Sequence, residues 1–164
     1  MKTLFAFFLI PILLYSCDIE YGMLDGSIDA ETFSVELFEE QAANAPVGYG
    51  AAYTDFFKDY MISRTKLDLK SKNADIEVSG RITYFNTTPV SVQSDELAAL
   101  NRLIVTLSVT VINNKNEDQS FEANFTQQSD FDANLDLTAV QSELLDDING
   151  KLSQDIINRL TSNW

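Results

Sequence analysis

The sequence has no histidine and only one cysteine, Cys17, and these two shortages exclude several kinds of chemistry. Without histidine, Ser-His-Asp and Cys-His catalytic sets cannot form, and zinc sites lose their usual ligands. A calcium loop is not expected at residues 130–136, because Leu135 stands where that loop requires glycine. A carboxylate pair or a Ser-Lys arrangement has no recognisable signature in the chain. We therefore expect no metal, no cofactor and no enzymatic activity.

Basic residues are also scarce. The chain has 11 Lys and Arg against 25 Asp and Glu, which gives a formal net charge of -14. A protein that binds nucleic acid needs a basic face, so we expect no nucleic-acid partner. Hydrophobic residues make up 45% of the chain, which is too many for a disordered acidic tail. These balances indicate a folded, acidic domain.

Residues 1–16 have the features of a removable export signal. Lys2 supplies a positive charge, and the apolar run from Leu4 to Leu14 is interrupted only by Pro11. That run is shorter than the roughly 20 apolar residues that span a bilayer and suits a signal peptide. It ends in Leu14-Tyr15-Ser16-Cys17, the pattern that a lipoprotein signal peptidase reads. A lone exported cysteine can also be buried or paired between chains, but its position at the cleavage site favours lipidation of Cys17.

A tether and one domain are predicted after the signal. Residues 17–30 are acidic, and Gly22 and Gly26 interrupt any regular element, so we predict a flexible tether behind the lipidated cysteine. Residues 31–164 are predicted to form a single domain, because a mature chain of 164 − 16 = 148 residues suits one compact core. Lipid chains on Cys17 would hold this domain at a membrane.

Hydrophobic periodicity predicts four strands and two helices. Alternation at period two predicts strands over residues 32–38, 76–84, 103–111 and 121–125. Apolar spacings of three and four predict helices over residues 51–62 and 140–160. Between the second and third strands, residues 86–101 are predicted to form a long loop.

This order of elements predicts an α+β domain, in which two helices cover one face of a small, mostly antiparallel four-stranded sheet. The side chains of the second strand expected to face the helices are Ile76, Val78, Ile82 and Tyr84. Gly80 falls on the same side and indicates a bulge or a close contact with its backbone. The opposite face of the sheet carries Glu77, Arg81, Thr106, Ser108 and Thr110, with Ile104 and Ile112 as apolar exceptions. We expect that face to be either solvated or a contact surface.

Several stretches of the chain carry a family resemblance. They are Arg64-Thr65-Lys66-Leu67, Ala74 to Ile82, Pro89 to Gln93, Glu96 to Leu103, and the closing Asn163-Trp164. Together they resemble the outer-membrane lipopolysaccharide-assembly lipoprotein family LptE, in its branch of short members. The resemblance extends from about residue 32 to the C-terminus, Ala98 to Arg102 is its most specific part, and the lipidated cysteine agrees with it independently.

The resemblance implies a fold, a place and a partner. Such proteins have two helices on a four-stranded sheet and sit as a plug inside the large outer-membrane barrel LptD. The resemblance therefore implies a non-enzymatic chaperone and plug that helps to deliver lipopolysaccharide to the outer leaflet. The protein would be lipid-anchored in the outer membrane, with its domain facing the periplasm or inside the barrel lumen.

Lipopolysaccharide is polyanionic, so an acidic chain needs a local basic patch to bind it. Arg64, Lys66, Lys70 and Lys72 lie within nine positions, and in an extended segment their even spacing would place them on one side. They are our first candidates for contact with lipopolysaccharide; the alternative is a solvated connector. Arg81 and Arg102 are secondary candidates, and each could instead pair with a carboxylate on a neighbouring strand.

Two other functions remain open at this stage. The chain could be a lipid-anchored binding module for a glycan or another envelope ligand, which would predict exposed aromatic platforms. A carboxylate-based hydrolase is the more distant alternative, and it would require a pocket with two facing carboxylates.

Overall fold

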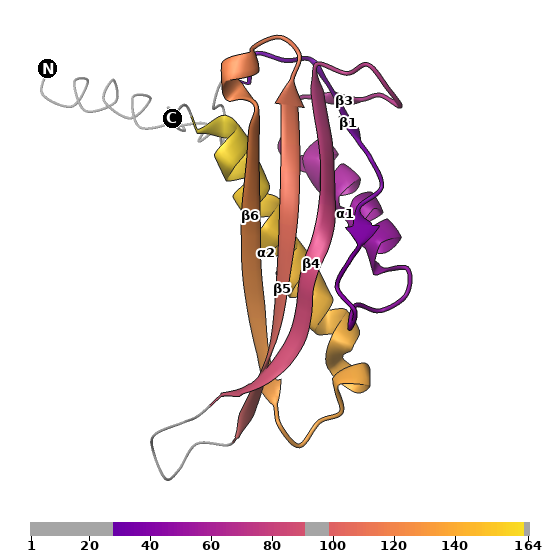
Figure 1. Cartoon of the computed structure of the whole chain (residues 1–164), viewed down its shortest axis with the longest axis vertical. Coiled ribbons are helices and arrows are strands. Elements are labelled where there is room, and N and C mark those ends of the chain that lie inside the picture. The colour runs from indigo at the N-terminus through magenta and orange to yellow at the C-terminus, as the bar shows by residue number, and fades with distance from the viewer. Residues whose placement is uncertain (1–27, 91–98, 163–164) are drawn as a thin grey trace, which may run out of the picture.

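The computed structural model describes residues 28–90 and 99–162 (Figure 1). Cys17, the predicted signal peptide and most of the predicted tether lie outside these ranges, as do residues 91–98 and Asn163-Trp164. The cleavage and lipidation of the N-terminus therefore stay predictions.

The described chain contains six strands and two α-helices. In order they are β1 (Thr32–Val35), β2 (Glu39–Glu40), α1 (Tyr49–Arg64), β3 (Asp68–Leu69), β4 (Ile76–Val90), β5 (Leu100–Asn113), a 3-10 turn η2 (Glu117–Gln119), β6 (Phe121–Asp132) and α2 (Leu137–Thr161). The α+β class and the two helices are confirmed, and both helices extend a little beyond their predicted bounds.

The sheet differs from the four-stranded, mostly antiparallel sheet that was predicted. It has six strands in the order β3-β1-β4-β5-β6, with β2 also paired to β4. β4, β5 and β6 are antiparallel, but β1 is parallel to both β3 and β4, and β2 is parallel to β4. The cause is α1, because a helix between two neighbouring strands carries the chain back to the end where it began and makes those strands parallel.

The hairpin of β4 and β5 is longer than predicted. Residues 86–90 and 100–101, which were assigned to a loop, continue the ladder, from Asn86 opposite Ile104 to Val90 opposite Leu100. Their polar side chains suit a strand here, because one face of an antiparallel sheet can remain in contact with water. Pro89 is tolerated because β1 and β2 pair with β4 only as far as Ile82, which leaves the later part of β4 at an edge.

A β-bulge changes which side chains of β4 face the helices. The register shifts between Ile82 and Tyr84, and the extra residue reverses the alternation beyond it. Tyr84, which was predicted to be inward, is 41% exposed, whereas Phe85 is buried. Gly80 makes the predicted close contact, but with a side chain: the ring of Phe38 occupies the space that a Cβ at this position would need.

Both helices pack on the same face of the sheet: in the view of Figure 1, α2 runs behind β4, β5 and β6, and α1 lies behind β4 and on the side of β1. Every second residue of β5 from Leu103 to Val111 is buried against them, as predicted. α1 contributes Tyr53, Phe57 and Met61 to this core, and α2 contributes the stripe from Leu144 to Leu160. Neither of the helices described in residues 28–90 and 99–162 is long and apolar enough to cross a membrane.

Tyrosine hydroxyls on α1 join the two helices. The Tyr49 hydroxyl donates to Asn149 Oδ1 at 2.7 Å, and the Tyr60 hydroxyl donates to Gln154 Oε1 at 2.8 Å. Burial raises the pKa of Tyr49 and of Tyr53, so both phenols stay protonated. The helix pair is thus fixed by directional bonds as well as by apolar packing.

Candidate functional site: the open face of the sheet

No helix covers the face of β4, β5 and β6 that points away from α1 and α2 (Figure 1). We call it the open face. The register places its side chains in cross-strand rows, for example Tyr84, Thr106 and Thr126 in one row and Asn86, Ile104 and Gln128 in the next. This is the surface for which the sequence predicted either exposure to water or contact with a partner.

Charged side chains near the two ends of the open face neutralise one another. Arg102 donates through Nε and Nη2 to the two carboxylate oxygens of Asp130, at 2.6 and 2.8 Å. These bonds lower the pKa of Asp130 and raise that of Arg102. At the other end, Arg81 lies 3.7 Å from Glu122. Both arginines therefore make the cross-strand pairs that were considered as their alternative role, and a contact with lipopolysaccharide remains a prediction for both.

The middle of the open face carries no charge. We call this region the uncharged patch; its members are Tyr84, Asn86, Ile104, Thr106, Ser108, Asn124, Thr126 and Gln128. Within it, the hydroxyls of Thr106 and Thr126 are 2.9 Å apart and hydrogen-bonded, and the Thr83 hydroxyl donates to the Thr106 carbonyl. The patch can offer hydroxyl and amide groups to a partner, together with one aromatic ring.

A polar groove lies beside the patch, where the chain passes from β1 to β2. Arg81 shares this groove with Glu36, Glu39 and Glu122, and Ser79 and Ser108 also line it. Three carboxylates around one guanidinium make the groove unsuitable for an anion. No group of metal-binding side chains that could hold an ion occurs among residues 28–90 and 99–162.

The four basic residues predicted to form a patch lie at the C-terminal end of α1 and in the segment after it. Arg64 is the last residue of α1 and lies 5.3 Å from the centre of the Tyr60 ring, while Lys66, Lys70 and Lys72 flank the two-residue strand β3. All four are exposed. The segment is only partly extended, so even spacing does not place all four on one face. In the described ranges, none of the four forms an ion pair.

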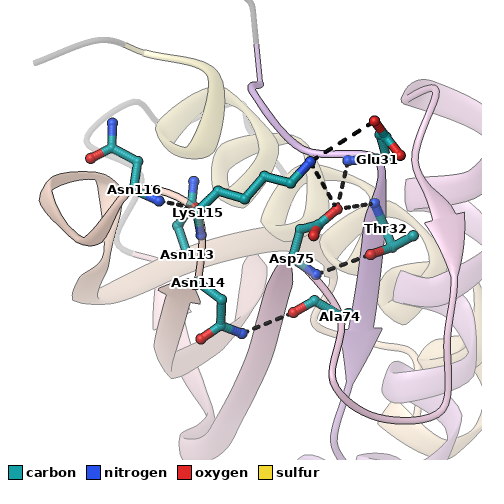
Figure 2. Close-up of polar contacts among 8 residues, drawn as sticks. All are labelled: Glu31, Thr32, Ala74, Asp75, Asn113, Asn114, Lys115 and Asn116. Carbon is teal, nitrogen blue, oxygen red and sulfur yellow. Dashed lines mark hydrogen bonds and ion pairs between the residues drawn. The ribbon is translucent and has the colours of Figure 1, made fainter.

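The end of the domain near the start of β1 and β4 is held by Asp75 (Figure 2). Asp75 Oδ2 accepts hydrogen bonds from the backbone N–H groups of Glu31 and Thr32 at 2.9 and 3.0 Å, and Lys115 Nζ lies 3.5 Å away. The Thr32 hydroxyl accepts from the backbone N–H of Asp75. The backbone bond from Glu31 is the largest of the effects that lower the pKa of Asp75 to about 2. This carboxylate fixes the register between β1 and β4.

The turn between β5 and β6 packs against the same corner (Figure 2). The Asn113 side-chain oxygen accepts from the backbone N–H groups of Lys115 and Asn116, and Asn114 Nδ2 donates to the Ala74 carbonyl. The bond from Asn114 to Ala74, 40 positions away, was not predicted from the sequence. No local pattern reports which backbone groups a distant side chain will reach.

Comparison with known proteins places the chain beside envelope lipoproteins. The family model described as LptE, lipopolysaccharide-assembly, matches residues 30–160. None of the curated proteins compared with the chain matches it.

Several solved structures have a similar fold. A hypothetical protein from Chlamydia trachomatis aligns with 80% of this chain and 96% of its own length, at 12% identity and a TM-score of 0.55. A minor lipoprotein from Acinetobacter baumannii aligns with 83% of this chain and 96% of its own, at 12% identity and a TM-score of 0.53. A protein from Xanthomonas campestris aligns with 80% of this chain and 85% of its own length, at 9% identity and a TM-score of 0.51. At such identities these likenesses show a shared fold.

Proposed function

The chain belongs to the LptE family of lipopolysaccharide-assembly lipoproteins, and we propose that it acts as a plug and chaperone of an LptD-type outer-membrane β-barrel. The match of the family model to residues 30–160 carries this proposal, because it includes all the strands and nearly all of both helices. In this role the protein assists the delivery of lipopolysaccharide to the outer leaflet.

The proposed role requires a rigid body that binds without covalent chemistry. The family is non-enzymatic, and the sequence offers no histidine for a nucleophilic or zinc-based mechanism. In the part of the chain that the structure describes, no buried side-chain nitrogen or oxygen lacks a hydrogen-bond partner. Such complete satisfaction favours a single packed arrangement, as a plug would need.

The proposed location is the outer membrane, with a lipid on Cys17 as the anchor. Two or more acyl chains attach a protein stably, whereas one chain gives only marginal binding. The domain would then sit at the periplasmic mouth of the barrel or in its lumen. A Cys17→Ser variant should be exported but recovered in the soluble fraction, and membrane recovery equal to that of wild type would contradict the anchor.

Contact with lipopolysaccharide is assigned, within this proposal, to Arg64, Lys66, Lys70 and Lys72. These four are exposed and make no ion pair in the described ranges, whereas Arg81 and Arg102 already face carboxylates. Replacing all four by glutamine should weaken binding to lipopolysaccharide in low salt. Arg81→Gln with Arg102→Gln serves as a control, in which loss of binding should be smaller. Equal binding by wild type and the fourfold variant would contradict the assignment.

The main test of the function is depletion of the protein in its own host. Lipopolysaccharide should then accumulate short of the cell surface, and a plasmid copy of the gene should restore its surface level. Normal surface lipopolysaccharide after depletion would contradict the proposed function. Purification through a C-terminal tag should also recover a large β-barrel protein with the chain.

One observation favours the alternative of a glycan-binding module. The uncharged patch presents hydroxyls, amides and Tyr84, which are groups that bind sugars. However, Tyr84 is the only strongly exposed aromatic side chain in the described ranges, so the extended aromatic platforms expected of such a module are not found there. Binding of the purified chain to envelope glycans in the absence of any barrel would support this alternative.

A further inference from the structure

The uncharged patch stands out against the charge of the rest of the chain. The sequence has 36 charged residues, 25 of them acidic, yet the open face of three adjacent strands carries none in the rows of Thr106 and Ile104, and Arg81 lies at the border, in the row of Ser108. The solvent-facing sides of the helices differ, because α1 exposes Asp55 and Asp59 and α2 exposes Glu143, Asp146 and Asp147. Contact with water does not explain why this surface lacks charge, because the other water-exposed surfaces of the same acidic protein are charged.

The physical advantage of such a surface appears when water is removed from it. A buried charge without a partner is costly, whereas hydroxyl and amide groups can exchange their bonds with water for bonds with a partner. The charges at the borders of the patch are already paired, Arg102 with Asp130 and Arg81 with Glu122. The open face can therefore be covered without leaving a lone charge at its centre.

The shape of the patch indicates what could cover it. It is formed by three hydrogen-bonded strands, and the pockets found in the described part of the chain do not open at its centre. A regular sheet face packs well against another sheet at about 10 Å. A β-barrel presents such a sheet to its lumen, with polar side chains inward. A polyanion is disfavoured, because the patch has no unpaired cation to offer it.

From these observations we propose that the uncharged patch is the surface that packs against the inner wall of the barrel partner. This inference rests on the proposed function and adds to it the contacting face. The helix surfaces, which expose several carboxylates, would then face water or the lumen contents.

The test uses charge placed at the centre of the patch. Asn86 and Gln128 are exposed on β4 and β6 and flank Ile104 in one row. Two double variants, Asn86→Lys with Gln128→Lys and Asn86→Glu with Gln128→Glu, introduce either sign. The matched control is Ser63→Lys with Ser142→Lys, which adds the same charge to exposed positions of α1 and α2. Each full-length, lipidated chain is tagged, expressed in the native host and purified in mild detergent.

We expect wild type and the helix control to recover equal amounts of barrel. Both patch variants should recover at least about tenfold less barrel than wild type, because each places an unpaired charge in a surface that loses water on binding. If both patch variants recover as much barrel as wild type, the inference is overturned while the proposed function stands. If wild type itself recovers no barrel, the proposed function fails first.

A second measurement keeps the test valid if a patch variant folds poorly. A photo-crosslinking residue at position 128 adds no charge and should form a covalent product with the barrel, identified by mass spectrometry. The same residue at position 142 on α2 should form little. Crosslinking of the barrel from position 142 and none from position 128 would overturn the inference. Crosslinking of position 128 to a glycan instead would overturn it in favour of the binding module.

Discussion

The two faces of β4, β5 and β6 are made by the same three strands but differ in composition and in what covers them. The face toward the helices is a row of fully buried aliphatic side chains, such as Leu103, Val105 and Leu107. The open face alternates with it and holds hydroxyls, amides and paired charges. The covered face explains why the domain folds, whereas the open face is the surface that remains available for a partner. The predictions below separate these two roles, from the largest expected effect to the smallest.

The largest difference is expected between two neighbours in β4. Phe85 is buried on the covered face, and Tyr84, beyond the bulge, lies 41% exposed on the open face. Phe85→Ala should cost about 3–5 kcal/mol of unfolding free energy by loss of core packing. Tyr84→Ala should change stability far less while still reducing recovery of the barrel. Urea unfolding measures the first effect, and equal losses of stability in the two variants would contradict the position of the bulge.

A smaller loss is expected when the covered face is overfilled. Gly80 lies under the Phe38 ring, so Gly80→Ala forces that ring to move and should destabilise the domain by about 1–3 kcal/mol. Gly150, in the middle of α2, has open space around its Cβ position, so Gly150→Ala should stabilise by about 0.5–1 kcal/mol. In thermal unfolding, Gly80→Ala should lower the melting temperature and Gly150→Ala should raise it. Destabilisation by both substitutions would indicate that helix α2 is placed wrongly.

Both faces depend on the register of β4, which Asp75 holds from the position just before the strand begins. The pKa of Asp75 is lowered from 3.8 to about 2, so its stabilising effect is complete above about pH 4 and is lost as the pH falls toward 2. Thermal unfolding followed by circular dichroism should show a fall in the melting temperature of wild type across this range.

Asp75→Asn should melt at a lower temperature near pH 7 and depend less on pH between about 4 and 2. Asp118→Asn removes an equal charge from the exposed turn between β5 and β6 and serves as the control, with an unchanged pH profile. If Asp75→Asn keeps the pH profile of wild type, the contacts of Asp75 drawn in Figure 2 are not the cause of the loss of stability at low pH.

The smallest effect is expected from the ion pair on the open face. The Arg102–Asp130 pair is partly exposed, and such pairs contribute little to stability and are screened by salt. Arg102→Gln should lower the melting temperature slightly in low salt, and the difference from wild type should vanish in about 1 M NaCl. A large, salt-independent loss would show that this pair belongs to the core instead.

Much of the covered face could be predicted from the sequence. The alternation from Leu103 to Val111 and the four-residue repeat in α2 are local patterns, and each reports one buried side of one element. The bulge at β4 was not visible, because a single inserted residue leaves the pattern of polar and apolar residues nearly intact. Tyr84 was therefore assigned to the wrong face.

The remaining errors concern contacts between distant parts of the chain. The parallel pairing of β1 with β4 depends on the path of α1, and the bonds of Asp75 reach residues 43 and 44 positions away. Residues such as Thr87, Thr88 and Pro89 look like a loop because they are polar or lack an N–H, yet an edge strand accepts them. The pairing of Arg81 and Arg102 with carboxylates was foreseen as an alternative, since neighbouring strands make such pairs common.

The central claim, that one copy of this chain plugs one barrel through its open face, is tested most directly by native mass spectrometry. The tagged chain would be purified from its own host in mild detergent and its complexes weighed intact. The claim predicts a complex of one chain and one large β-barrel, which the Asn86→Lys, Gln128→Lys variant fails to form. Recovery of the wild-type chain alone, or of the same complex from both proteins, would contradict it.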